Sequence, residues 1–123
     1  MTTTIESNGY VKPDELFKPM VRRFEDVTIT GLGKFRLRTL TAGEAAQYAA
    51  KRISRDGGMS HQGMLTSNAR IIVLCCVDHE GNQIFSDDDI LRIQQLPAGQ
   101  VATLAAECLQ HCGMADAEEE AKN

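Results

Sequence analysis

The chain has 123 residues, a net charge of −4 and 5% aromatic residues, and it contains no tryptophan. Its length suits one domain with a single modest core, which must be built mainly from aliphatic side chains. No apolar run approaches the ~20 residues that span a bilayer. The first residues also lack the basic and apolar regions of a secretory signal, so we expect a cytoplasmic protein that does not enter a membrane.

Charge is distributed unevenly along the chain. Nine basic residues stand against three acidic ones over residues 18–55, whereas residues 78–90 carry five acidic residues and no lysine or arginine. Such a chain can associate head to tail with another copy or bind partners of either sign. The basic half makes a small nucleic-acid-binding regulator an alternative. It lacks interleaved aromatic residues and a recognition motif, however, which argues against nucleic acid as a partner.

The chain begins with a polar segment. Residues 1–12 show no periodicity, so we expect them to form a flexible arm. Residues 13–17 predict one helical turn, which Pro19 stops because proline cannot continue a helix. We place a single domain over residues 13–113 and an acidic, disordered tail over residues 114–123.

A β-hairpin is predicted over about residues 21–40. Two runs that suit strands are joined by a Gly-Leu-Gly turn, and short glycine-containing turns are typical of hairpins. In the second run Phe35 and Leu37 share one face, whereas Arg36 and Arg38 share the other. The hairpin therefore has a buried face and a cationic face, and it must pack on the helices or on another chain, because a lone hairpin is marginal in water.

Helices are expected over about residues 41–54, 64–77, 86–96 and 97–112. The first opens with a capping box formed by Thr41 and Glu44. The second contains a continuous apolar run, and we interpret it as a central buried helix because it has no breaker and exceeds the length of a typical strand. The predicted fold is therefore α+β, a mainly helical domain of about four helices with an N-terminal β-hairpin and flexible termini.

Residues 78–90 form an acidic turn that leads into a helix. A calcium loop starting at Asp78 needs glycine at its sixth position and glutamate at its twelfth, but these positions hold Gln83 and Asp89. Helix capping explains the residues better, because Ser86 is a good N-cap and Asp89, three residues later, can complete a capping box with it. The aspartates between them suit the positive end of the helix dipole. We therefore interpret this segment as a turn and a cap, not as a metal site.

Cys75, Cys76, Cys108 and Cys112 raise zinc binding as a further hypothesis, with His111 close to the last two. Structural zinc sites favour cysteine pairs on turns, and adjacent cysteines point to different sides of a helix. We therefore interpret the cysteines as small buried hydrophobic residues in a reducing compartment. The sequence contains no nucleophile motif, no phosphate-binding loop and no cofactor fingerprint. These observations indicate a protein-binding domain, not an enzyme.

Two motifs in this order resemble a known family. The first is an arginine-rich strand followed by Leu-Thr and a helix start, over residues 35–44. The second is Val-Asp-His-Glu-Gly-Asn-Gln-Ile-Phe-Ser-Asp-Asp-Asp over residues 77–89, before Leu91 and Leu96. Over about residues 20–113 the chain resembles the tail assembly chaperones of long-tailed bacteriophages and related prophages. The resemblance implies a non-enzymatic protein that escorts the tape measure protein during tail assembly and is absent from the finished virion.

A chaperone of this kind needs a face that holds its client. The candidates are the hairpin edge and a basic face that could pair with an acidic client or with the aspartates of a neighbouring copy. The basic residues are Arg36, Arg38, Lys51 and Arg52, and the aspartates are Asp87, Asp88 and Asp89. Simple solvation of surface charge also explains each of these residues. Another structural tail or head-tail component is the alternative among phage proteins, although a tail tube needs longer strands than one hairpin provides.

Overall fold

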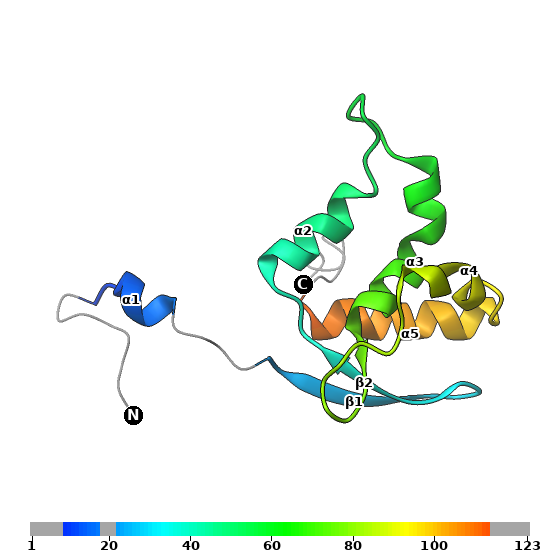
Figure 1. Cartoon of the computed structure of the whole chain (residues 1–123), viewed down its shortest axis with the longest axis horizontal. Coiled ribbons are helices and arrows are strands. Elements are labelled where there is room, and N and C mark those ends of the chain that lie inside the picture. The colour runs from blue at the N-terminus through cyan, green and yellow to red at the C-terminus, as the bar shows by residue number, and fades with distance from the viewer. Residues whose placement is uncertain (1–8, 18–21, 114–123) are drawn as a thin grey trace, which may run out of the picture.

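The computed structural model describes residues 9–17 and 22–113. In chain order its elements are α1 (Pro13–Leu16), β1 (Phe24–Ile29), β2 (Gly33–Arg38), α2 (Ala42–Ala50), α3 (His61–Cys75), β3 (Cys76–Val77), the 3-10 helix η1 (Asp87–Asp89), α4 (Ile90–Ile93) and α5 (Ala98–His111). Helices gather on one side of a small sheet (Figure 1). The predicted α+β class, with an N-terminal hairpin and a mainly helical remainder, is confirmed.

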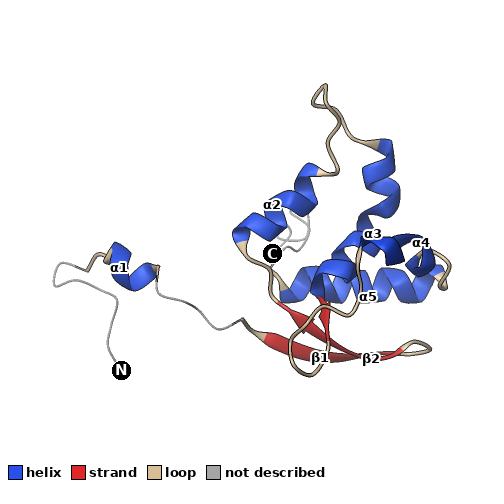
Figure 2. Ribbon diagram, in the orientation of Figure 1, coloured by secondary structure: helices blue, strands red, loops and turns tan. Residues whose placement is uncertain are grey.

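The sheet is antiparallel and has the strand order β1-β2-β3. Leu37 in β2 pairs with Cys76 in β3, and both side chains are fully buried. Helix α5 runs along β1, because Gln100 near its start donates to the Thr30 carbonyl and His111 at its end contacts the Arg23 carbonyl. Figure 2 shows α5 lying over one face of the strands, so sheet and helices form two layers around one core.

The core lies between α3, α5 and the inner face of the sheet. Its largest fully buried side chains are Leu37, Ile71, Ile72, Cys75, Cys76 and Cys108. The apolar run expected to be most buried therefore does form the centre of the molecule. Phe35, on the same face as Leu37, packs against this cluster from its edge. The buried and charged faces expected for the second hairpin strand are observed.

Three helices differ in extent from the sequence expectation. Helix α2 ends at Ala50, before the antiparallel bridge between Ile53 and Met59 that closes the following loop. Helix α3 begins earlier, at His61, and its expected last residues instead form β3, because they pair with β2. The segment expected as a helix over 86–96 forms η1 and the single turn α4.

Part of the expected chain organisation lies outside the described residues. This applies to residues 1–8 of the expected flexible arm and to all of the expected acidic tail at 114–123. The single helical turn expected over 13–17 is present as α1. None of the helices in the described ranges combines the length and the hydropathy needed to cross a bilayer.

Candidate protein-binding site

The two arginines expected on the cationic face of the hairpin both contact the chain itself. Arg36 Nε donates to Asp26 Oδ1 at 2.9 Å, across the β1–β2 pair, and its side chain is 39% exposed. Arg38 Nε donates to the Leu74 carbonyl at 2.8 Å, near the C-terminal end of α3, and its side chain is only 11% exposed. Arg38 thus caps a helix end, where a cation is favoured by the dipole. Of the two, Arg36 is the more available to a partner.

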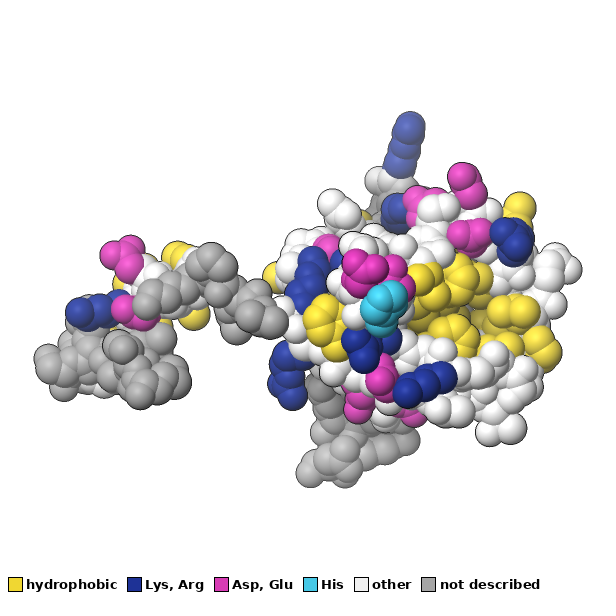
Figure 3. Space-filling model, turned by 60° about the horizontal axis from the view of Figure 1, so that its bottom comes forward, with side chains coloured by type: hydrophobic (Ala, Val, Ile, Leu, Met, Phe, Trp, Pro, Cys, Tyr) yellow, Lys and Arg dark blue, Asp and Glu magenta, His cyan; other side chains and the backbone are white. Residues whose placement is uncertain are grey.

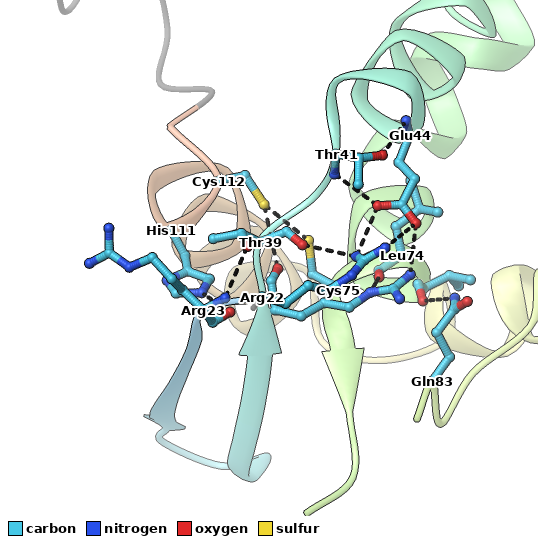
Figure 4. A network of polar contacts seen from close by, with 12 residues as sticks. Arg22, Arg23, Thr39, Thr41, Glu44, Leu74, Cys75, Gln83, His111 and Cys112 are labelled. Carbon is cyan, nitrogen blue, oxygen red and sulfur yellow. Dashed lines mark hydrogen bonds and ion pairs between the residues drawn. The ribbon is translucent and has the colours of Figure 1, made fainter. Parts of the chain in front are cut away.

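Arg38 belongs to a charge network that joins the hairpin to α2 and α3 (Figure 4). Arg22 donates to both carboxylate oxygens of Glu44, at 2.9 and 3.0 Å, and Arg38 Nη2 lies 3.6 Å from the second oxygen. Glu44 also accepts from the Thr41 backbone N–H, completing the predicted capping box. The hydrogen bonds from Arg22 lower the pKa of Glu44 to about 2. The network therefore holds elements together within the fold.

The remaining charged candidates do not form one surface. Lys51 Nζ lies 4.0 Å from Asp87 Oδ2 in the same chain, and both line a cavity of about 50 Å³ beside Tyr48. Arg52 Nη2 contacts the Met64 sulfur at 3.5 Å, on the other side of α2's end. The structure thus brings Lys51 and Asp87 together. Partner binding stays a prediction for all of the charged candidates, which are Arg36, Arg38, Lys51, Arg52, Asp87, Asp88 and Asp89.

The acidic turn uses its carboxylates for local hydrogen bonds. Asp78 Oδ1 accepts from the backbone N–H groups of Glu80 and Asn82, at 2.8 and 3.0 Å, and these bonds lower the pKa of Asp78. Gly81 has a φ of 89°, which the turn requires and glycine adopts readily. Asp89 Oδ2 accepts from the Ser86 backbone N–H at 2.9 Å, as the capping interpretation predicted. The described residues contain no group of three or more His, Cys, Asp or Glu able to hold a metal ion.

An apolar groove lies immediately after this turn. It has a volume of about 330 Å³ and is lined by Ile84, Phe85, Asp89, Arg92, Ile93 and Leu96. Ile84 is 46% exposed and Leu96 is 43% exposed, whereas Ile93 is buried at the base of the groove. The molecular surface shows hydrophobic side chains gathered in one broad area beside charged ones (Figure 3). Exposed apolar area of this kind typically marks a surface that binds another molecule.

Hydrogen bonds anchor both walls of the groove to α3 and to the start of β3. On one wall, the Ile84 N–H donates to the Cys76 carbonyl and Gln83 Nε2 donates to the Val73 carbonyl at 2.8 Å. On the other wall, Gln94 Nε2 donates to the Leu65 carbonyl of α3 at 3.0 Å. Because the walls are anchored before any partner arrives, binding orders little additional chain. The groove is preformed.

Sequence reasoning missed this groove. The expected acidic turn included Ile84 and Phe85, and Leu96 was expected at the end of a longer helix. A signal was nevertheless present, because Ile90, Ile93 and Leu96 recur every three residues shortly after the apolar pair Ile84 and Phe85. Such a stripe, placed after an apolar extended pair, indicates two apolar walls.

The fold is similar to that of a solved structure, the tail assembly chaperone of bacteriophage HK97. The superposition has a TM-score of 0.54 at 15% sequence identity, and it covers 72% of this chain and 84% of that chain. No protein-family model and no curated protein sequence matches the chain. The resemblance predicted from the two motifs is therefore confirmed at the level of the fold.

Proposed function

We propose that this protein is a non-enzymatic phage tail assembly chaperone that binds the tape measure protein during tail morphogenesis in the cytoplasm of a bacterial host. The observation that carries the proposal is the preformed apolar groove, on a fold similar to that of the HK97 protein. A chaperone must leave apolar surface exposed for its client, and the groove does so next to a well-packed core.

The groove suits one apolar face of a helix in the client. Its base is apolar, and the carboxylate of Asp89 and the guanidinium of Arg92 stand at one edge, 3.3 Å apart. A helix that presents apolar residues three and four positions apart can place them on Ile84 and Leu96 while its polar face remains in water. The Asp89–Arg92 pair then offers both signs of charge to that polar face and fixes its orientation.

The test is copurification of the full chain with the tape measure protein encoded in the same phage or prophage genome. Leu96→Asp places a charge in the groove and is expected to weaken the complex by about tenfold or more. Ile84→Asp on the facing wall is expected to do the same. Both side chains are partly exposed in the free protein, so the fold should tolerate either change.

The matched control is Leu91→Asp. Leu91 lies in α4 and is 71% exposed, but it does not line the groove. It carries the same change of charge and should bind the tape measure protein as the wild type does. If all three variants bind equally well, the groove is not the client site. If the wild-type chain itself does not bind the tape measure protein, the proposed function is wrong.

A further inference from the structure

All four cysteines of the chain meet at one place in the core. Cys75 ends α3, Cys76 begins β3, and Cys108 and Cys112 lie one turn apart at the end of α5. Cys75 Sγ and Cys112 Sγ are 3.5 Å apart, and they point toward each other in Figure 4. All four thiols are free. Cys75 and Cys112, which are far apart in the sequence, are thus close enough for a disulfide to form after a small movement.

The two members of this pair differ in their access to solvent. Cys75 is fully buried, whereas Cys112 is half-buried at the C-cap of α5. The residues that flank Cys112, His111 and Gly113, line an open hollow of about 440 Å³ together with Arg23. Cys112 does not line this hollow itself, but its partial exposure makes it the member of the pair that a small molecule can reach, with Cys75 Sγ 3.5 Å away on the buried side.

We propose that Cys75 and Cys112 form an oxidisable thiol pair. Its co-reactant is a small disulfide such as oxidised glutathione, and its product is an intrachain disulfide that ties the end of α3 to the end of α5. The pair is separated by 37 positions in the sequence, so the bond closes a long loop and restricts the unfolded chain strongly.

The reaction proceeds by two thiol–disulfide exchanges. First Cys112 loses its proton and attacks one sulfur of oxidised glutathione, which breaks the S–S bond, and the departing glutathione thiolate takes up a proton. Then Cys75 loses its proton and attacks Cys112 Sγ, which forms the intrachain bond and releases the second glutathione. Two protein thiols are oxidised and one glutathione disulfide is reduced to two thiols.

The surroundings of Cys75 favour its thiolate in the second step. Thiol hydrogen bonds from Cys108 and from Cys112 lower the pKa of Cys75, and the nearby positive charges of Arg38 and His111 act in the same direction, although burial opposes them. The pKa values of the Cys108 and Cys112 thiols are both raised, chiefly by their hydrogen bonds with Cys75, so access to solvent and not acidity distinguishes Cys112. Cys108 is also fully buried, so it lacks the access that the first step requires.

Treatment of the full-length protein with oxidised glutathione tests the proposal, followed by intact-mass measurement and peptide mapping without reduction. The wild type should lose two hydrogen atoms and yield a peptide pair linked through Cys75 and Cys112. Cys75→Ser should stop at the first step and gain the mass of one glutathione on Cys112. Cys112→Ser should yield no intrachain bond.

Cys108→Ala is the matched control within the same cluster, and it should still form the Cys75–Cys112 bond. Oxidised wild type should also unfold at a midpoint temperature at least about 5 °C above that of the reduced protein. The proposal is overturned if the wild type accumulates only the glutathione adduct, or if mapping places the intrachain bond at Cys108. Both results can be read from the wild type alone, even where a variant fails to fold.

Discussion

At Gly63, α3 passes close to the backbone at the end of α2. Gly63 is buried in the first turn of α3, and its N–H donates to the capping hydroxyl of Ser60 at 3.1 Å. A Cβ atom at this position would lie 2.1 Å from the Lys51 carbonyl oxygen and 2.9 Å from Arg52 Cα. These are backbone atoms of another segment, so no rotamer change can relieve the clash. Gly63→Ala must therefore move α2 and α3 apart.

The cost of this movement can be worked out from the contacts at the same place. Overpacking a well-filled site costs about 1–3 kcal/mol. The Gly63 carbonyl also accepts from Arg70 Nη2 at 2.6 Å, and Arg70 Nη1 donates to the Tyr48 carbonyl at 3.2 Å. Loss of one such charged hydrogen bond costs roughly 1.5–3 kcal/mol, while the better helix propensity of alanine returns up to about 1 kcal/mol. We expect a net loss of about 2–4 kcal/mol.

Urea unfolding followed by circular dichroism measures this loss. With a denaturant slope of roughly 2 kcal/mol/M, the midpoint should fall by about 1–2 M. The control is Gly99→Ala in the first turn of α5, where a Cβ would have no neighbour within 4 Å. It should leave the midpoint unchanged or raise it slightly. If the two variants are equally stable, the close contact between α2 and α3 is absent and this reasoning is refuted.

Three further predictions concern single contacts. Because the folded-state pKa of Glu44 is lowered from 4.5 to about 2, its bond to Arg22 stabilises the fold above pH ~4.5 and loses this effect as the pH falls toward 2. Glu44→Gln should therefore lower the free energy of unfolding measured with urea at pH 6 by about 1 kcal/mol after allowance for solvent screening, and the difference from wild type should disappear only as the pH falls to about 2. Arg70→Lys should cost about 2 kcal/mol in urea unfolding, since one ammonium cannot span the acceptors that the guanidinium bridges. Gly81→Ala should lower the thermal midpoint by a few degrees, because φ is 89° and the new methyl group would lie 3.2 Å from the Phe24 ring.

Local signals in the sequence predicted the local structure well. The Thr41 and Glu44 capping box starts α2, and the Gly-Leu-Gly turn joins β1 to β2. These features depend on residues within a few positions of one another, so the local sequence alone determines them. The hairpin faces follow for the same reason, because alternation along a strand fixes which side chains share a face.

Contacts between distant segments could not be predicted in this way. Arg38 looked like a surface cation, but it bonds to the Leu74 carbonyl, 36 positions away. Cys76 looked helical, but pairing with Leu37 draws it into a strand. In both cases the contact forms because the hairpin packs against α3. A local sequence pattern contains no information about that packing.

The motif at residues 77–89 links the fold to the candidate site. Its polar residues have internal partners, since Asp78 holds the turn, Gln83 caps α3 and Asp89 closes the start of η1. Phe85 is partly buried against the core, whereas Ile84, between Gln83 and Phe85, is 46% exposed. The exposed part of Ile84 is therefore available to a partner. The polar residues of the motif therefore position the groove in which, under the proposed function, Ile84 would contact the client. Substitution of Asp78 or Gln83 should accordingly reduce stability and binding together, whereas Ile84→Asp should reduce binding alone.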